Sequence, residues 1–253
     1  MISISEAQIL GWITPVLWPF LRVLALFQVM PVMGQRTVPV RVRVGLSFLI
    51  AFSAMGVSPE VKPVPLDSAL AMMLVVQQVL IGVTLGFAVR LVFAAVELAG
   101  EIAGLQMGMN FAGFFDPISA SQATATSRFF GTLIAFLFVV INGHLSVIEA
   151  VMQSLVVFPV GPEPFAFLKA MAPQAWGAEV FRMGLWIATP LIAILLIVNL
   201  VLGVISRVAP QTHIFSLGFP ITMGVGLLGM MFMLPLMESP FVAALQRTLA
   251  LFH

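Results

Sequence analysis

The sequence contains no cysteine and no tyrosine, and charged residues make up only 8% of it. The absence of cysteine excludes a disulfide framework and a thiolate metal site. Soluble domains carry about 25% charged residues, whereas this chain of 253 residues is 61% hydrophobic, with a mean hydropathy of +1.14. We therefore predict an integral membrane protein. The net charge of +1 gives no reason to expect a nucleic acid as a partner.

The sequence also lacks the motifs that mark common catalytic sites. It has no Walker A motif, no dinucleotide glycine fingerprint, no HExxH and no GxSxG. Glu97 and Glu101 lie on one face of a helix, and such a pair could serve acid–base chemistry. A pair that faces water or meets Arg90 or Arg128 fits the surrounding sequence better. We expect no catalytic residue, no cofactor and no metal, and therefore a protein that is not an enzyme.

Hydrophobic segments divided by proline, glycine and charged residues predict an all-α membrane protein. In lipid, only helices and closed barrels satisfy all of their backbone hydrogen bonds. About 20 apolar residues cross the hydrocarbon core, and the second segment, with 14 residues, is short for a span. The six segments are residues 9–33, 44–57, 68–96, 128–158, 180–207 and 215–236.

The arginines near these segments predict an orientation and one internal contact. Arg36, Arg41 and Arg43 lie between the first two segments with no acid among them, which predicts the cytoplasmic side of the membrane. Arg22 lies in the middle of the first segment. Because no acid lies near it in the sequence, snorkelling or pairing with a backbone carbonyl is favoured over a functional charge. A GxxxG pair at residues 82–86 permits close helix contact.

The stretch from Glu97 to Pro117, ELAGEIAGLQMGMNFAGFFDP, differs from the segments around it. It holds a glycine every four or five residues and two glutamates, and Asp116-Pro117 ends it. Non-helical backbone at membrane depth survives only where protein or a water-filled cavity surrounds it. We therefore predict that a loop over about residues 97–127 lines and closes a pore.

Four pieces of the chain, in the right order, resemble the FliR/SctT family. These proteins are membrane components of the type III export gate of flagella and of virulence injectisomes. Each piece is modest alone, whereas the four together are specific. LQMGMNFAGFFDP favours the flagellar form. The pieces are WPFLRVLALFQVMPVMGQRTVPVRVRVGL (18–46), QQVLIGVTLGFAVRLVFAAVELAGEIAGLQMGMNFAGFFDP (77–117), NGHL (142–145) and NLVLGVISRVAPQTHIFSLGFPI (199–221).

The resemblance implies a fold, a location and partners. Residues 1–175 would form a FliP-like helical portion, and residues 176–253 a FliQ-like hairpin with a carboxy-terminal helix. In the family, bent helical hairpins lie largely above the membrane plane. If this chain folds in the same way, fewer than six of its hydrophobic segments cross the membrane. The implied location is the bacterial inner membrane, in the flagellar basal body. The implied partners are FliP-like and FliQ-like subunits in a helical hetero-oligomer, FliB/FlhB-type and FlhA-type export components, unfolded exported proteins and membrane lipid.

The resemblance also implies a plug. In the family, a loop of this subunit reaches into the central channel with bulky apolar side chains. Apolar side chains at a constriction stop water and ions by dewetting, and flexible Met and Gly can reseal around a moving chain. The alternative is that the phenylalanines simply pack a core. Carried onto this chain, the plug residues are Met107, Met109, Phe111, Phe114 and Phe115, and the hinges are Gly104, Gly108 and Gly113.

The sequence thus predicts a subunit that helps to form and close the channel for unfolded flagellar proteins. Other functions stay open: a stand-alone transporter or channel for small solutes, an injectisome homologue, and a scaffold that nucleates the basal body. A transporter is expected to have paired inverted repeats, and none is visible. The candidates for a charged channel lining or for contacts between subunits are Glu97, Glu101, Arg90 and Arg128.

Overall fold

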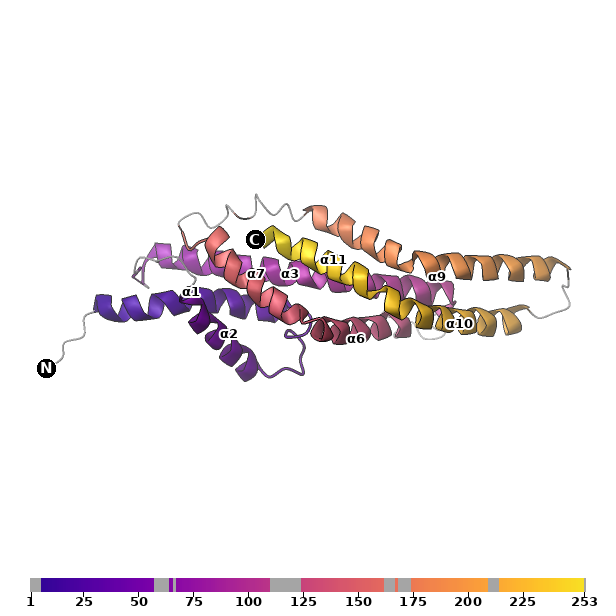
Figure 1. The fold of residues 1–253 in the computed structure, drawn as a ribbon, viewed down its shortest axis with the longest axis horizontal. Coiled ribbons are helices and arrows are strands. Elements are labelled where there is room, and N and C mark those ends of the chain that lie inside the picture. Colours follow the sequence, from indigo (N-terminus) through magenta and orange to yellow (C-terminus); the bar gives the residue numbers. More distant parts are fainter. Residues whose placement is uncertain are drawn as a thin grey trace. The chain divides into compact units, whose positions relative to one another are not determined.

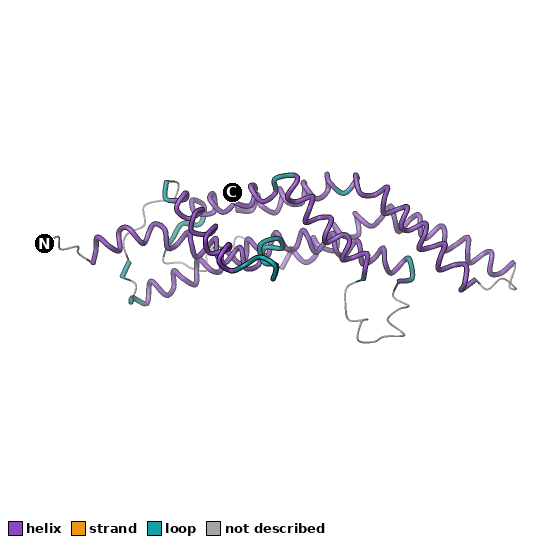
Figure 2. The backbone as a smooth tube through the Cα atoms, turned by 90° about the horizontal axis from the view of Figure 1, so that it is seen from below, coloured by secondary structure: helices purple, strands orange, loops and turns teal. Residues whose placement is uncertain are grey.

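The computed structural model describes residues 6–56, 64–65, 67–109, 124–161, 167, 174–208 and 214–252. Figure 1 shows the helices in chain order, and Figure 2 shows that helix makes up almost all of the described chain, with no strand in it. The all-α prediction is confirmed. The elements are α1 (Glu6–Val29), α2 (Val40–Ala54), α3 (Ala69–Gln106), α6 (Ala125–Val140), α7 (Gly143–Val157), α9 (Gln174–Val208), α10 (Ile214–Met233), η2 (Leu234–Leu236), α11 (Glu238–Leu249) and η3 (Ala250–Phe252).

Not every hydrophobic segment is long enough to cross a membrane. Within the described residues, four stretches pass by length and composition: Leu10–Val29, Ala69–Gln106, Trp176–Val208 and Gly218–Leu236. The pair α6 and α7, which is interrupted between Val140 and Gly143, adds a fifth if it counts as one span. The second segment forms α2, whose 15 residues reach only about 22 Å against a core of about 30 Å.

Helix α3 continues into the glycine-rich stretch. The sequence places the start of the loop at about residue 97, whereas α3 ends at Gln106 and α6 already begins at Ala125. A glycine in a helix interior destabilises the helix by about 0.5–1 kcal/mol relative to alanine. The close packing of α3 against α6, described below, compensates for this cost. The loop is therefore shorter at both ends than its composition indicates.

The chain forms two compact units, each built from separated parts of the sequence. The first unit comprises residues 1–91, 138–176 and 245–253, and the second comprises residues 92–137 and 177–244. Helix α3 contributes to both. The predicted division at residue 175 rests on the resemblance to two kinds of subunit, and it stays a prediction.

In the first unit, the GxxxG pair brings α3 close to α1. A side-chain carbon added at Gly82 would collide with the carbonyl oxygen of Arg22 and would lie 2.9 Å from the Cβ of Ala25. A carbon added at Gly86 would lie 2.8 Å from the carbonyl oxygen of Leu26. The predicted close contact is confirmed. It brings residue 78, one turn before Gly82, against α1.

Arg22 is fully buried and joins three segments of the first unit. Its Nε donates to Oε1 of Gln78 on α3 at 2.8 Å. Its Nη1 donates to the backbone oxygen of Ser154 at 2.5 Å and to Oγ of that serine at 3.0 Å. Its Nη2 donates to the backbone oxygen of Phe158 at 2.8 Å. The two carbonyls stand at the end of α7, where the helix dipole favours a cation. The predicted pairing of Arg22 with backbone carbonyls is confirmed.

Side-chain amides of α3 extend this arrangement beyond α7. Nε2 of Gln78 donates to Oε1 of Gln77 at 3.1 Å, and the same oxygen accepts from the backbone nitrogen of Gly161 at 3.3 Å. Nε2 of Gln77 donates to the backbone oxygen of Pro159 at 3.5 Å. The chain that leaves α7 is therefore held by the same helix that holds Arg22. We call Arg22, Gln77, Gln78 and Ser154 the arginine cluster.

In the second unit, α9 and α10 form a hairpin. Helix α9 ends at Val208 and α10 begins at Ile214, and Gly229 lies against the side chain of Leu191. These two contact residues are almost equally far from the connection, as expected of antiparallel helices. The hairpin predicted from the fifth and sixth segments is present, while its likeness to a FliQ-type subunit stays a prediction.

We predict that Arg22→Leu destabilises the first unit. The substitution removes every hydrogen bond of the guanidinium and leaves buried carbonyls unpaired, and hydrogen bonds to charged groups contribute about 1.5–3 kcal/mol each. We expect a loss of about 2–4 kcal/mol in the free energy of unfolding, measured on the purified protein in detergent. Arg22→Lys keeps the charge without the planar fork, so its loss is expected to be intermediate.

Arg41→Leu is the matched control, because Arg41 is exposed on α2. It is expected to leave the unfolding midpoint unchanged. Equal stability of Arg22→Leu and the native protein would contradict the structural role of the arginine cluster.

Candidate functional site

The structure describes the base of the predicted plug loop. We call residues 97–109 and 124–131 the loop base, because they end and begin the helices on either side of the loop. All of them belong to the second unit. Of the predicted plug and hinge residues, the loop base contains Gly104, Met107, Gly108 and Met109. The others, Phe111, Gly113, Phe114 and Phe115, lie outside the described residues.

Glu101 ties the two sides of the loop base together. Its Oε2 accepts hydrogen bonds from the backbone nitrogen of Thr124 at 3.2 Å and from Oγ1 of Thr124 at 2.8 Å. The same threonine oxygen accepts from the backbone nitrogen of Ser127 at 3.2 Å, so Thr124 caps the start of α6. The carboxylate thus stands at a helix N-terminus, where the dipole favours negative charge. Charge-assisted hydrogen bonds therefore join α3 to the beginning of α6.

Small residues let α3 and α6 touch along their backbones at the loop base. A side-chain carbon added at Gly100 would lie 2.9 Å from the Cα of Ser127, and one added at Gly104 would collide with the hydroxyl of Thr126. Oγ of Ser127 also donates to the backbone oxygen of Glu97 at 3.0 Å. Gly104 therefore serves helix packing. Gly108, in the turn after α3, has a φ of 79°, in the left-handed region that favours glycine.

Met107 fastens the end of α3 to α10. Its side chain is fully buried and covers Gly226, where an added carbon would lie 2.5 Å from the Cε of Met107. The hydroxyl of Thr222, one turn earlier on α10, lies 3.4 Å from the backbone oxygen of Met107. The same hydroxyl lies 3.0 Å from the backbone oxygen of Gly218 on its own helix, so its single proton is shared among these acceptors. Met107 is packed at the loop base, and its part in the plug stays a prediction.

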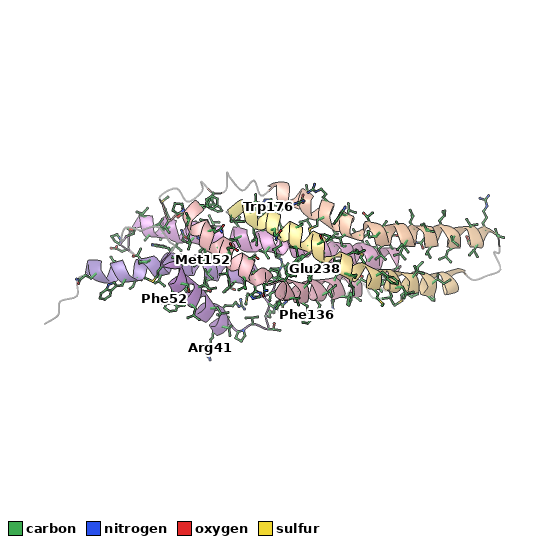
Figure 3. The ribbon with its side chains drawn as sticks, viewed as in Figure 1. Arg41, Phe52, Phe136, Met152, Trp176 and Glu238 are labelled. Atoms are coloured by element: carbon green, nitrogen blue, oxygen red, sulfur yellow. The ribbon has the colours of Figure 1, made fainter. Side chains whose placement is uncertain are left out.

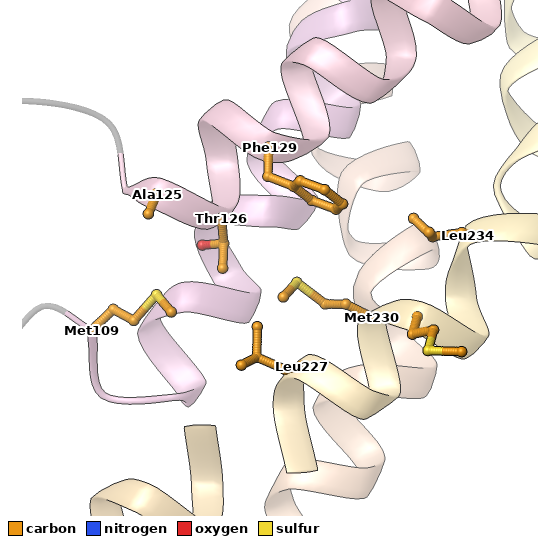
Figure 4. A pocket seen from close by; sticks show the side chains of 8 residues that line it. Met109, Ala125, Thr126, Phe129, Leu227, Met230 and Leu234 are labelled. Atoms are coloured by element: carbon orange, nitrogen blue, oxygen red, sulfur yellow. The ribbon is translucent and has the colours of Figure 1, made fainter. Parts of the chain in front are cut away.

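An apolar cavity of about 410 Å³ lies beside the loop base (Figure 4). Both sides of the base contribute to it, and α10 with η2 completes the wall. The cavity is open to its surroundings, its lining is almost wholly apolar, and methionine adapts its shape to what fills the space. The cavity can therefore hold bulky apolar side chains. Its lining includes Met109, Ala125, Phe129, Leu227, Met230 and Leu234.

The four charged candidates have different surroundings. Arg90 is exposed on the part of α3 that belongs to the first unit, and Arg128 is exposed near the start of α6. The carboxylate of Glu97 lies over Gly131, where an added carbon would be 3.1 Å from its Oε1. Glu101 is half-buried and bound to Thr124. Glu101 therefore belongs to the loop base, and a channel lining or subunit contact at the other positions stays a prediction.

Sequence reasoning missed most of the residues that hold the loop base. Thr124 and Ser127 stand in a run of small polar residues in the sequence, yet Thr124 caps α6 and Ser127 belongs to that helix. A threonine followed three residues later by serine is a weaker cap signal than the Ser/Thr-x-x-Glu box. Thr222 gave no signal at all, because its partner Met107 lies 115 positions away in the chain.

Comparison with known proteins points to one family. The family model of the bacterial export proteins, family 1, matches residues 13–248. The chain is 42% identical over 241 residues to the flagellar biosynthetic protein FliR of Escherichia coli (strain K12), covering 95% of this chain and 92% of that protein. It is 39% identical to FliR of Pectobacterium carotovorum subsp. carotovorum, with the same coverage. It is 28% identical to FliR of Bacillus subtilis (strain 168) over 213 residues, covering 81% and 80%.

We predict that Glu101→Ala opens the loop base without unfolding the unit. The variant loses the acceptor of two hydrogen bonds and a favourable charge at the start of α6. We expect the backbone amides of residues 124–127 to exchange with deuterium roughly tenfold to hundredfold faster, as loss of about 1.5–3 kcal/mol requires. Glu179→Ala is the control, because it removes only an exposed ion pair with Arg182. Unchanged exchange rates in Glu101→Ala would show that the hydrogen bonds between Glu101 and Thr124 do not hold the two sides of the loop base together.

We predict that valine is poorly tolerated at two glycines of the loop base. At Gly104 the added side chain collides with Thr126, and at Gly108 the left-handed backbone costs an L-residue about 1–2 kcal/mol. Each variant is expected to lower the unfolding midpoint in detergent. Gly203→Val on α9 is the matched control, since a carbon added there meets nothing within 4 Å. Native-like midpoints for both test variants would contradict the close packing.

Proposed function

Because the chain belongs to family 1 of the bacterial export proteins, we propose that it is a non-enzymatic subunit of the flagellar protein export gate. In this role it helps to form and to close the inner-membrane channel through which unfolded flagellar proteins pass. Its named relatives are flagellar biosynthetic proteins, and the match covers nearly the whole chain. This favours the flagellar role over an injectisome role and over a stand-alone solute transporter.

The observation that best supports a role in closing the channel is that both sides of the loop base are held in place. Met107 fixes the α3 side to α10, and Glu101 fixes the α6 side through Thr124. A plug needs fixed ends so that its tip stays over the channel. The stretch between the anchors holds Phe111, Phe114 and Phe115, which are bulky enough to exclude water and ions from a narrow passage.

The exposed apolar surface of α9 and α10 supports an assembly within a membrane. Monomeric soluble proteins rarely expose large contiguous apolar patches. The proposed neighbours are FliP-like and FliQ-like subunits and lipid, with FlhB-type and FlhA-type components and the exported chains as further partners. Side chains of the two helices that are more than 60% exposed include Phe181, Trp186, Leu196, Leu200 and Phe232.

Deleting residues 111–115 is expected to leave the assembly intact and to make the inner membrane leak ions. The bulky apolar residues are lost while both anchors of the loop base remain. Conductance is measured in planar bilayers that contain the purified assembly. Replacing Phe111, Phe114 and Phe115 by leucine preserves apolar bulk and is expected to keep the channel tight. A deletion with unchanged conductance would exclude the plug.

The partners are tested separately from the plug. The tagged protein is extracted gently from its own membranes and its native mass is measured. Recovery in a large complex with FliP-like and FliQ-like chains supports the export gate. Recovery alone or as a small homo-oligomer, in cells that contain those partners, would favour a stand-alone transporter.

A further inference from the structure

Helix α2 buries one stripe of polar and small residues and exposes most of its large apolar ones. Its buried residues are Arg43, Ser47, Ala51 and Ala54. An amphipathic helix of a soluble protein turns its apolar stripe toward the core, so α2 is oriented in the opposite way. The exposed side chains are 39–62% accessible, and they include Val44, Phe48, Leu49, Phe52 and Met55.

Specific polar contacts hold α2 in this orientation. Nη1 of Arg43 donates to Oε1 of Gln28 on α1 at 2.7 Å, and its Nη2 donates to the backbone oxygen of Val38 at 3.0 Å. Within the helix, Oγ of the buried Ser47 donates to the backbone oxygen of Arg43 at 2.7 Å. Rotating α2 to hide its phenylalanines would break the bond between Arg43 and Gln28 and expose a buried stripe of small residues. The outward apolar face is therefore built into the first unit.

Positive charge lies beside this apolar face. Arg41, Phe48 and Phe52 share one stripe of the helix, at i, i+7 and i+11, and Figure 3 shows Arg41 and Phe52 projecting from α2. Arg36 is also exposed, just before the helix. The sequence has no Asp or Glu between Glu6 and Glu60. A surface that joins exposed arginines to exposed phenylalanines matches the phosphate and acyl layers of an anionic lipid leaflet.

We propose that α2 lies in the plane of the membrane and docks its apolar face into the anionic cytoplasmic leaflet, with Arg36 at the lipid phosphates and the long side chain of Arg41 snorkelling to the same layer. Interfacial helices bury their apolar face about 5–10 Å deep, and arginine binds phosphate oxygens through its planar fork. The helix is too short to span, and charged residues flank it in the sequence on both sides, so both of its ends belong in the headgroup layer. This role is independent of whether the loop closes a pore.

Two other arrangements would use the same surface differently. A helix inserted across the leaflet would place Phe52 much deeper than Val44. A partner protein seated on α2 would shield both residues from lipid. The absence of cysteine from the chain makes these cases separable, because single cysteines can carry a spin label at chosen positions.

The first test measures the depth of labels at Val44→Cys, Phe48→Cys and Phe52→Cys. The full chain, with the subunits that copurify with it, is reconstituted into vesicles of phosphatidylcholine and phosphatidylglycerol. Docking in the plane predicts high accessibility to oxygen and equal depth at the three positions. Ala51→Cys, buried against the protein, is the control and is expected to be inaccessible. A depth difference of about 12 Å between 44 and 52, or low oxygen accessibility at all three, would overturn the proposal.

The second test removes the charge. Native mass spectrometry measures the retention of phosphatidylglycerol relative to phosphatidylcholine. Arg36→Gln and Arg41→Gln are each expected to weaken phosphatidylglycerol retention by roughly fivefold, the contribution of one basic residue near an anionic surface. Arg247→Gln, an exposed arginine on α11, is the control. Unchanged retention in the double variant of Arg36 and Arg41 would overturn the anionic part of the proposal.

Discussion

A single cation held among neutral oxygens organises the first unit. Burying an arginine costs several kcal/mol unless hydrogen bonds compensate for the lost water, and the guanidinium of Arg22 meets four acceptors. It reaches them only because Gly82 and Gly86 let α3 lie against α1. The end of α7 and the chain that follows it are then placed by the same side chains. Small residues set the distance between the helices, and the arginine sets their register.

The second unit repeats this arrangement at the loop base. Gly100 and Gly104 bring α6 against α3, and Glu101 then bonds across the contact to Thr124. In lipid, apolar side chains give helices little reason to prefer one another, because acyl chains are as apolar as leucine. Close backbone contact and a few polar bonds therefore decide which helices pair. The loop between α3 and α6 inherits fixed ends from this pairing.

The sequence revealed the features that depend on local pattern. Hydrophobic segments in lipid are expected to be helical, and the lack of an acid near Arg22 in the sequence favours snorkelling or pairing with a backbone carbonyl. The contacts of the loop base could not be predicted from the sequence, because they join residues that are far apart in it. Glu101 contacts Thr124, 23 positions away, and Thr222 contacts Met107, 115 positions away. The glycines at 100 and 104 were interpreted as loop residues because composition cannot distinguish flexibility from close packing. The length of the second segment shows that it is short for a span, but it does not show which of its side chains α2 buries.

The chemistry of the acceptors around Arg22 has a consequence for a membrane protein. A membrane can separate compartments that differ in pH. Amide, hydroxyl and backbone carbonyl oxygens neither gain nor lose protons in the physiological range, so proton flow across the membrane gives this cluster nothing to respond to. A carboxylate in the same place would bind the arginine more strongly, but it would also make the packing of the first unit sensitive to protonation. With neutral acceptors, the packing of the first unit does not depend on the protonation of any partner of Arg22.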